Sequence, residues 1–343
     1  MDSLTQIVLG AAVGEATLGK KVGNKAMLWG AIAGTIPDLD VIGRFFMDDI
    51  SAQEFHRGIS HSLIFSSVLA PILGWLLFKF HEKRKNEASF KQWSWMFFLT
   101  LVTHPLLDCH TTWGTQFFWP FDLRIAYNNI NVVDPAYTLP FLVLVIMALL
   151  AKRGSRNRKR LNNLGLIISS AYMLLTIGFK FYTKSVFEKN LSQKNIEYAH
   201  FSNKPTFGNG FLWTATVDVK DSFLIGYYSI FDKDRNIQFH SYPKNYDLLK
   251  PYENEDQVKR LIFLTQNWYV VQQDSNHLYL CDLRFGESYE NSGVIVFMNE
   301  LINENGKIVV KRKKPDFDKS DFPKLIGMLY RRAFGDKSQV FVK

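Results

Sequence analysis

The sequence predicts an α-helical membrane bundle of about six helices, followed by a small α+β domain with an antiparallel sheet. The first observation is a change in composition, since residues 1–182 are apolar with short basic stretches and residues 183–343 are polar and mixed. The second is a series of apolar segments that approach the width of a bilayer. We therefore expect a membrane domain over 1–182 and a soluble domain over 183–343.

The composition of the 343 residues excludes two classes of protein. The chain is 47% hydrophobic and 15% aromatic, whereas disordered chains are poor in aromatic residues. It has two cysteines, Cys109 and Cys281, which lie in different regions and are predicted to be free thiols. Two cysteines are too few for a disulfide-stabilised scaffold or a cysteine-rich zinc module.

Six segments have the apolar character expected of membrane helices, which need about 20 residues to cross the hydrocarbon core. They are 3–19, 25–44, 60–79, 93–109, 136–151 and 163–182. The third is predicted to begin at Ser60, a favourable N-cap residue. The first two are weaker because they are rich in glycine and carry acidic residues, although small residues permit close helix contacts in a membrane. Any one segment alone would also fit a buried helix of a soluble bundle.

Basic residues in alternate loops predict the orientation of this half. They concentrate between the first and second, the third and fourth, and the fifth and sixth segments. The positive-inside rule places these loops in the cytoplasm, so the C-terminal domain is expected on the exoplasmic side. The net charge of +9 comes largely from these loops. Membrane lipids, and not nucleic acid, are therefore the expected partner, and the oligomeric state stays open.

The ionisable residues of the apolar half gather at the predicted exoplasmic ends of its helices. Such groups are costly in a membrane and indicate function by default. The main residues are Asp38, Asp40, His56, His61, His104 and Asp108, with His110 and Asp134 nearby. Taken singly, each also fits a capping residue, a turn or a kink, so the prediction of a shared site depends on their joint placement.

Imidazole and carboxylate groups together favour a divalent metal, with zinc first and manganese as the alternative. His104 and Asp108 are four residues apart and project from one helix face. Asp38 and Asp40 would share a face in extended chain. One or two ions are open, and two ions bridged by a carboxylate suit three histidines and three aspartates better than one.

Four stretches of the apolar half resemble a known group: DSLTQIVLGAAVGEATLG, GTIPDLDV, HRGISHS and HPLLDCHTTWGTQ. They are similar to the bacterial membrane-bound metal-dependent hydrolase family, which in turn resembles LexA-regulated inner-membrane proteins. Its members are called hydrolases largely by analogy with zinc-dependent phospholipase C-like proteins. The resemblance implies a multi-pass protein of the inner membrane. It also implies metal ligation by Asp38, His56, His61, His104 and Asp108.

Four further residues receive hypotheses. Asp40 and Asp134 are candidates for a catalytic general base, or for orienting a ligating histidine. Arg57 and Arg124 are candidates for contacts to a substrate phosphate, because guanidinium groups bind phosphate with two hydrogen bonds. The alternative for both arginines is an ion pair or a lipid headgroup. The polar start of the chain, Asp2 to Gln6, either lines the site or simply begins a helix.

The polar half is predicted to begin with a helix over 184–200 and to end with one over 320–334. Alternating apolar and aromatic residues predict strands at 211–219, 222–231, 259–272, 277–285 and 293–298. The basic run 311–314 is predicted to be a solvated face.

The function we expect is metal-dependent hydrolysis of a phosphoester or lipid-linked substrate at the exoplasmic membrane surface, through metal-activated water. The alternatives are a non-catalytic membrane protein with a structural metal and a metal or ion transporter. Transport sites normally lie near the bilayer midplane within related repeats, whereas these ligands lie at helix ends and no internal repeat is found.

Overall fold

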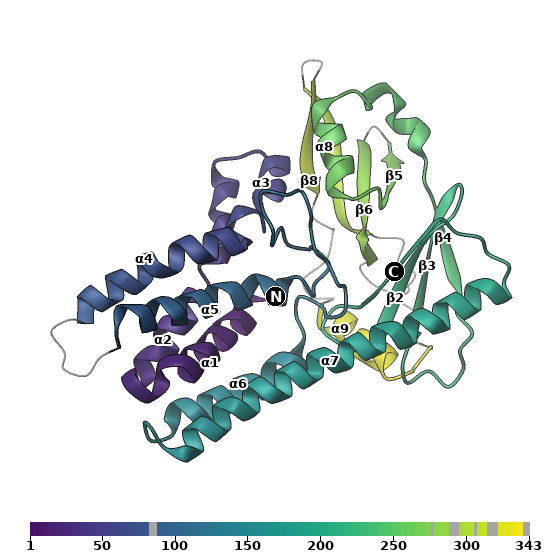
Figure 1. Ribbon diagram of the computed structural model, residues 1–343. Helices are drawn as coiled ribbons and strands as arrows, with labels where there is room; N and C mark the ends of the chain where they lie inside the picture. The colour runs from purple at the N-terminus through teal and green to yellow at the C-terminus, as the bar shows by residue number, and fades with distance from the viewer. Residues whose placement is uncertain (82–87, 276, 288–294, 305–306, 314–321, 339–343) are drawn as a thin grey trace. The chain divides into compact units, whose positions relative to one another are not determined.

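The computed structural model describes residues 1–81, 88–275, 277–287, 295–304, 307–313 and 322–338. They form two compact units, one of residues 1–45 and 55–177 and the other of residues 46–54 and 178–343. The first unit is helical, and the second carries two antiparallel sheets (Figure 1). The predicted order of a helical part and then an α+β part is confirmed. The prediction of one small sheet is wrong, because there are two sheets of four strands each.

The helical unit consists of α-helices joined by two 3-10 helices that contain site residues. Its elements are α1 Ser3–Val22, α2 Asn24–Ala33, η1 Pro37–Phe45, η2 Ile59–His61, α4 Leu63–His81, α5 Phe90–Asp108, α6 Pro135–Leu150 and α7 Arg156–Gln193. Helix α7 continues into the second unit. Asp2 caps α1 by accepting a hydrogen bond from Thr5 N at 3.1 Å, so the ordinary helix-start interpretation holds for Asp2.

Helices α1 and α2 lie in backbone contact along a row of glycines. Gly10 and Gly14 on α1 face α2, and Gly30 and Gly34 on and just after α2 face α1. A Cβ atom added to Gly30 would lie 2.2 Å from the Gly10 carbonyl oxygen. Small residues spaced by four allow this approach, as at helix interfaces in membranes. The close approach of the two helices therefore fixes the position of Gly34, from which the chain continues toward η1.

Two helices in the described residues are long and apolar enough to span a membrane, namely α4 and α7. The prediction of about six spanning helices is therefore not met. Helix α2 has 10 residues and α6 has 16, both short of the roughly 20 that a bilayer core requires. Helix α1 carries Glu15, Lys20 and Lys21 near its end.

Two predicted boundaries in this unit are wrong. The segment 25–44 divides into α2 and η1, because Pro37 has no backbone N–H and disfavours helix in the preceding residue. Helix α4 begins at Leu63, and its start is capped by Ser62, whose Oγ accepts a hydrogen bond from Phe65 N at 3.0 Å. Ser60 lies before the helix, in η2.

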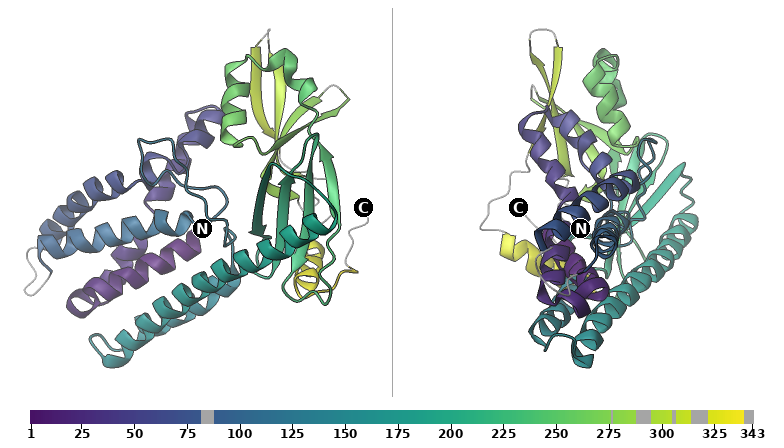
Figure 2. Two further views of the ribbon diagram at one scale, coloured as in Figure 1. Left: turned by 45° about the vertical axis from the view of Figure 1, so that its right-hand side comes forward. Right: turned by 60° about the vertical axis from the view of Figure 1, so that its left-hand side comes forward.

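The second unit contains two four-stranded sheets with orders β1-β2-β3-β4 and β5-β6-β7-β8, paired antiparallel throughout. The C-terminal part of α7 covers one face of the first sheet (Figure 2), with Phe187 and Leu191 against Trp213. Helix α8 packs on the second sheet. The elements are α3 Asp49–Phe55, β1 His200–Pro205, β2 Leu212–Asp218, β3 Ser222–Ser229, β4 Phe239–Pro243, η3 Tyr246–Tyr252, α8 Asp256–Leu264, β5 Tyr269–Asp274, β6 His277–Glu287, β7 Ile295–Glu304, β8 Lys307–Lys313 and α9 Phe322–Ala333.

The predictions for this half were correct for four strands, β2, β3, β6 and β7, and for the closing helix α9. The strand predicted at 259–272 is wrong, because its first part is α8 and only its end is β5. Gln266 and Asn267 have positive φ and form the turn between them. Strands β1, β4 and β8 were not predicted. Lys311 to Lys313 lie in β8, and Lys314 lies outside the described residues. Both cysteines are buried free thiols, as predicted.

Candidate metal centre

Four predicted site residues come together in the helical unit. Asp38 lies on η1, His61 on η2, and His104 and Asp108 one turn apart near the end of α5. Each offers one ligand atom, and the four atoms lie within 4.8 Å of one another. The side chains of His61, His104 and Asp108 are at most 1% exposed, whereas that of Asp38 is 23% exposed. The cluster is therefore accessible from the side of Asp38.

The spacing of these atoms suits a single tetrahedral ion. The two imidazole Nε2 atoms are 3.2 Å apart. Asp38 Oδ1 lies 3.4 Å from each of them, and Asp108 Oδ2 lies 3.5 Å from each. A tetrahedral zinc ion with bonds of about 2.0–2.1 Å separates its ligand atoms by about 1.63 bond lengths, or roughly 3.3–3.4 Å. The described residues thus fit one ion, and the preference for two is not supported.

Hydrogen bonds on the far side of each ring indicate which nitrogen is the ligand. His104 Nδ1 donates to the carbonyl oxygen of Gly34 at 2.6 Å, so its Nε2 carries the lone pair in the neutral ring. His61 Nδ1 lies 2.9 Å from Ser60 Oγ, and Ser60 Oγ donates to Asp40 at 3.0 Å. The two Nε2 lone pairs therefore face each other, an arrangement that a cation stabilises.

Asp40 supports the cluster from behind and does not belong to it. Its Oδ2 accepts hydrogen bonds from the backbone N–H of Arg57 at 2.8 Å and from Ser60, and lies 3.3 Å from His61 Nδ1. Its Oδ1 is 2.9 Å from His56 Nδ1. A carboxylate behind a metal-binding histidine fixes its tautomer and ring orientation. Both oxygens are engaged, a geometry that favours the predicted orienting role for Asp40, and its role as a general base stays a prediction.

Asp108 has a buried carboxylate oxygen, Oδ2, that accepts no hydrogen bond in the described part of the chain, although it lies 3.3 Å from Arg57 Nε. Oδ1 accepts from Gln6 Nε2 at 3.1 Å and contacts the α-amino group of Met1. A buried carboxylate oxygen that accepts no hydrogen bond is costly, even with a guanidinium nearby. A cation bound between Asp108 and the two imidazoles would satisfy it, so the donor set fits a divalent metal.

Two other predicted residues, His56 and Asp134, lie outside the four-atom cluster. His56 is turned to Asp40 and stacks edge-on against Trp113, so its predicted role as a fifth ligand is not supported by the geometry. Asp134 caps α6 through Ala136 N at 3.0 Å and accepts from Tyr172 at 3.0 Å. Because both oxygens of that carboxylate are engaged at the helix end, the geometry gives the general-base hypothesis for Asp134 no support.

The remaining candidates have structural partners. Arg124 donates to the carbonyl oxygen of His56 at 3.0 Å. His110 is 2.8 Å from Asn129 Oδ1, and burial lowers its pKa. Arg57 adopts φ +59° and its Nη1 donates to Thr111 Oγ1 at 2.7 Å, which places a buried guanidinium beside Asp108.

Sequence reasoning missed the groups that hold the ligands in place, chiefly Ser60, Thr111 and the Gly34 carbonyl. Ser60 directly precedes a predicted ligand, which was the available signal, but it was interpreted as a helix cap. The role of Gly34 is carried by a backbone atom and leaves no trace in side-chain chemistry.

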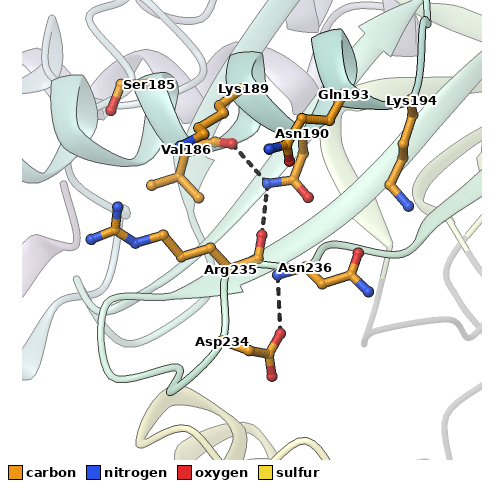
Figure 3. Close-up of a pocket in the computed structure, with 9 residues that line it drawn as sticks. All are labelled: Ser185, Val186, Lys189, Asn190, Gln193, Lys194, Asp234, Arg235 and Asn236. Carbon is orange, nitrogen blue, oxygen red and sulfur yellow. Dashed lines mark hydrogen bonds between the residues drawn. The ribbon is translucent and has the colours of Figure 1, made fainter.

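A separate groove of about 470 Å³ lies in the second unit, between α7 and the loop after β3 (Figure 3). Asn190 closes its floor by donating to the carbonyl oxygens of Val186 at 2.9 Å and Arg235 at 2.7 Å. Its lysines lie near the C-terminal end of α7, where cations complement the helix dipole. The metal-ligand cluster and this groove belong to different units, and we assign the groove no ligand.

Comparison with known proteins finds a family match that covers the helical unit. Residues 1–185 match the family described as YdjM inner membrane protein. The chain belongs to this family. It is also similar to the inner membrane protein YbcI of Escherichia coli (strain K12), with 31% identity over 141 residues, which is 38% of this chain and 78% of that protein. No solved structure matches the chain. The matched range of the chain includes all four cluster residues, and the family is described as one of inner membrane proteins.

Proposed function

We propose that this inner membrane protein is a metal-dependent hydrolase that acts on a phosphoester, with a lipid-linked substrate favoured. The observation that carries the proposal is the largely buried cluster of two histidines and two aspartates, with the Arg57 guanidinium and His56 beside it. A purely structural ion needs four ligands and nothing more. Arg57 and the pair of His56 with Asp40 are additional groups with catalytic chemistry.

Asp38, His61, His104 and Asp108 would hold the ion, with Asp40 and the Gly34 carbonyl orienting the two rings. Zinc is the first choice, because nitrogen and carboxylate ligands at this spacing suit it, and manganese is the alternative. A bound divalent ion would supply Lewis acidity, and a water of lowered pKa would require a fifth position or release of the partly exposed Asp38. The protein's own residues then bind and orient the substrate and move protons.

Arg57 is placed to bind a phosphate oxygen at the cluster. Its Nε lies 3.3 Å from Asp108 Oδ2 and its Nη1 is held by Thr111, which fixes the plane of the guanidinium. Arg124, in contrast, is engaged with the carbonyl oxygen of His56. His56 is oriented by Asp40 through Nδ1 and is 26% exposed, so its other nitrogen is suited to exchange a proton with a substrate or leaving group.

The lipid-linked substrate class is supported by η1 itself. This element places Asp38 in the cluster and turns apolar side chains outward, and its exposed residues are Leu39, Val41, Ile42 and Phe45. Exposed apolar residues in an inner membrane protein are suited to contact lipid. A substrate with an acyl or polyprenyl chain could contact these residues while its phosphoester reaches Asp38 and Arg57.

The charges at the ends of the two candidate spans support an exoplasmic location of the site. Helix α4 has Lys79 near its end, and α7 begins with Arg156, Arg158, Lys159 and Arg160. The positive-inside rule would place these ends in the cytoplasm. The start of α4, two residues after His61, and the C-terminal end of α7 would then face the exoplasm.

The test is metal content and hydrolysis measured together on detergent-purified protein. We expect about one equivalent of zinc or manganese by mass spectrometry, and phosphate release from a panel of lipid phosphomonoesters and phosphodiesters in mixed micelles. His61→Ala should lose both, while His200→Ala, an exposed histidine of the second unit, should keep both. Full hydrolysis by His61→Ala would refute the assignment.

A structural metal is the second candidate, because four protein atoms already complete a tetrahedral set. Stoichiometric metal without turnover of any phosphoester, together with a large loss of thermal stability on chelation, would favour it. Uptake of the metal into sealed vesicles would instead favour a transporter.

A further inference from the structure

The chain between the two site-bearing 3-10 helices leaves the helical unit and returns. Residues 46–54 include all of α3 except Phe55. They belong to the second unit and pack with its sheet domain. The residues on either side belong to the first unit. Asp40 lies six residues before this excursion begins, and His56 and Arg57 lie two and three residues after it ends.

Helix α3 is anchored in the second unit by a fully buried side chain. Ile50 is 0% exposed and lies in a core that includes Leu249, Val258 and Leu261, from η3 and α8. Asp48 caps the helix, because its Oδ1 accepts from Ile50 N at 3.1 Å and Ser51 N at 2.9 Å. Burying an isoleucine against another element gives this short helix a fixed position that its seven residues could not maintain alone.

Charged groups reinforce the same attachment. Arg260 of α8 binds the Glu54 carboxylate with two hydrogen bonds, of 3.0 Å from Nε and 2.6 Å from Nη2, and also donates to Ser51 Oγ at 2.8 Å. The backbone N–H of Arg312 on strand β8 donates to Asp49 at 3.0 Å. A two-point arginine–carboxylate contact fixes orientation as well as distance.

The two ends of the excursion are joined in the site. The backbone N–H of Arg57 donates to Asp40 Oδ2 at 2.8 Å, and His56 Nδ1 lies 2.9 Å from Asp40 Oδ1. The chain from 40 to 57 is therefore a loop whose ends meet at the metal cluster and whose middle is held by the second unit. A loop with an anchored middle has fewer conformations, so its ends are held closer to the geometry that the cluster requires.

We propose that α3 is the element through which the C-terminal domain positions the metal site, with Glu54 and Arg260 as positioning residues. The proposal rests on the metal site of the proposed function. The C-terminal domain would hold Asp40, His56 and Arg57 in their positions at the cluster. The family match ends at residue 185, whereas the residues that hold α3 lie between 249 and 312. This chain thus uses its additional domain to order a loop of the family core.

The test is a charge reversal across the Glu54–Arg260 pair in the full-length protein. Glu54→Arg and Arg260→Glu are each expected to lower zinc affinity about 10-fold, the lower end of the effect of outer-shell partners. Zinc affinity is measured by competition with a chromophoric chelator. The double variant should recover most of the affinity, with Asp256, 3.7 Å from Arg260 Nη1, limiting full recovery. Reversal of the exposed pair Glu304 and Lys311 is the matched control and should change nothing.

A second readout does not depend on the metal. Hydrogen exchange of residues 38–61 in the chelator-treated protein should accelerate in each single variant and return toward the wild-type rate in the double variant. Unchanged exchange and unchanged zinc affinity in both single variants would overturn the proposal. Absence of zinc binding in the wild type would refute the proposed function instead, and the exchange rates would still decide the role of α3.

Discussion

Replacing Gly30 by alanine is expected to weaken metal binding without touching any ligand. The new Cβ would lie 2.2 Å from the Gly10 carbonyl oxygen, whereas ordinary contacts begin near 3.4 Å. The α2 backbone fixes the position of the new Cβ, and the oxygen belongs to the α1 backbone. The two helices must therefore separate by about 1.2 Å to accommodate the methyl group. Overpacking of this kind typically destabilises a protein by about 1–3 kcal/mol.

The displacement reaches the site through Gly34, one turn after Gly30. The Gly34 carbonyl accepts the His104 Nδ1–H hydrogen bond of 2.6 Å that holds the ligating ring. Metal sites tolerate shifts of roughly 0.5 Å, and loss of an outer-shell partner typically lowers metal affinity about 10–100-fold. We therefore expect Gly30→Ala to bind zinc at least about 10-fold more weakly than wild type.

The assay is zinc competition against a chromophoric chelator in detergent, at a temperature where thermal unfolding shows the variant to be folded. The control is Gly178→Ala, also in a helix, where an added Cβ meets no atom within 4 Å. Its zinc affinity should equal that of wild type. Wild-type affinity in folded Gly30→Ala would refute the link between the glycine contact and the position of His104.

Three further predictions concern the cluster, a buried ion pair and a buried lysine. Asp108→Asn should lower metal affinity, measured by equilibrium dialysis, by more than the roughly 10–100-fold of an outer-shell change. Asp134→Asn, in which asparagine is still a good helix cap, should leave the affinity unchanged. Equal losses in the two variants would contradict the assignment of Asp108 as a ligand. Arg158→Met leaves the Glu15 carboxylate buried and unpaired and should destabilise the protein by about 3–5 kcal/mol in thermal unfolding, with recovery on adding Glu15→Leu. Burial lowers the pKa of Lys204 from 10.5 to about 7. Between these two pH values the unfolded chain binds more protons than the folded one, so the free energy of unfolding should rise with pH by up to about 1.4 kcal/mol per unit. The same slope in Lys204→Met would exclude Lys204 as its cause.

The residues of the cluster were predictable because chemistry and position agreed. Histidine and aspartate are costly in an apolar region, and four of the five predicted ligands lie together in the structure. Their binding of a metal stays a prediction. His56 was grouped with them by spacing and by the family resemblance, and neither shows that Asp40 lies between His56 and the cluster.

The strand predicted at 259–272 shows a limit of local pattern. Short apolar runs fit a strand or a buried helix equally well, and packing against β8 decides the first part as α8. The number of membrane-spanning helices was overestimated for a related reason. Segments such as 25–44 are apolar enough in composition, but the turn before Pro37 breaks the helix and directs Asp38 and Asp40 into the site.

The family resemblance implied the inner membrane. The sequence by itself determined the division into an apolar helical part and a mixed α+β part, and the candidate residues of the site. These depend on composition, periodicity and side-chain chemistry, which are local properties of the chain. Only the tertiary structure decided which imidazole nitrogens face each other, that Asp40 lies behind His61 and outside the four-atom cluster, and that α3 is held by residues some 200 positions away in sequence. Those features arise from contacts between distant segments, and a local pattern contains no information about which distant segments will meet.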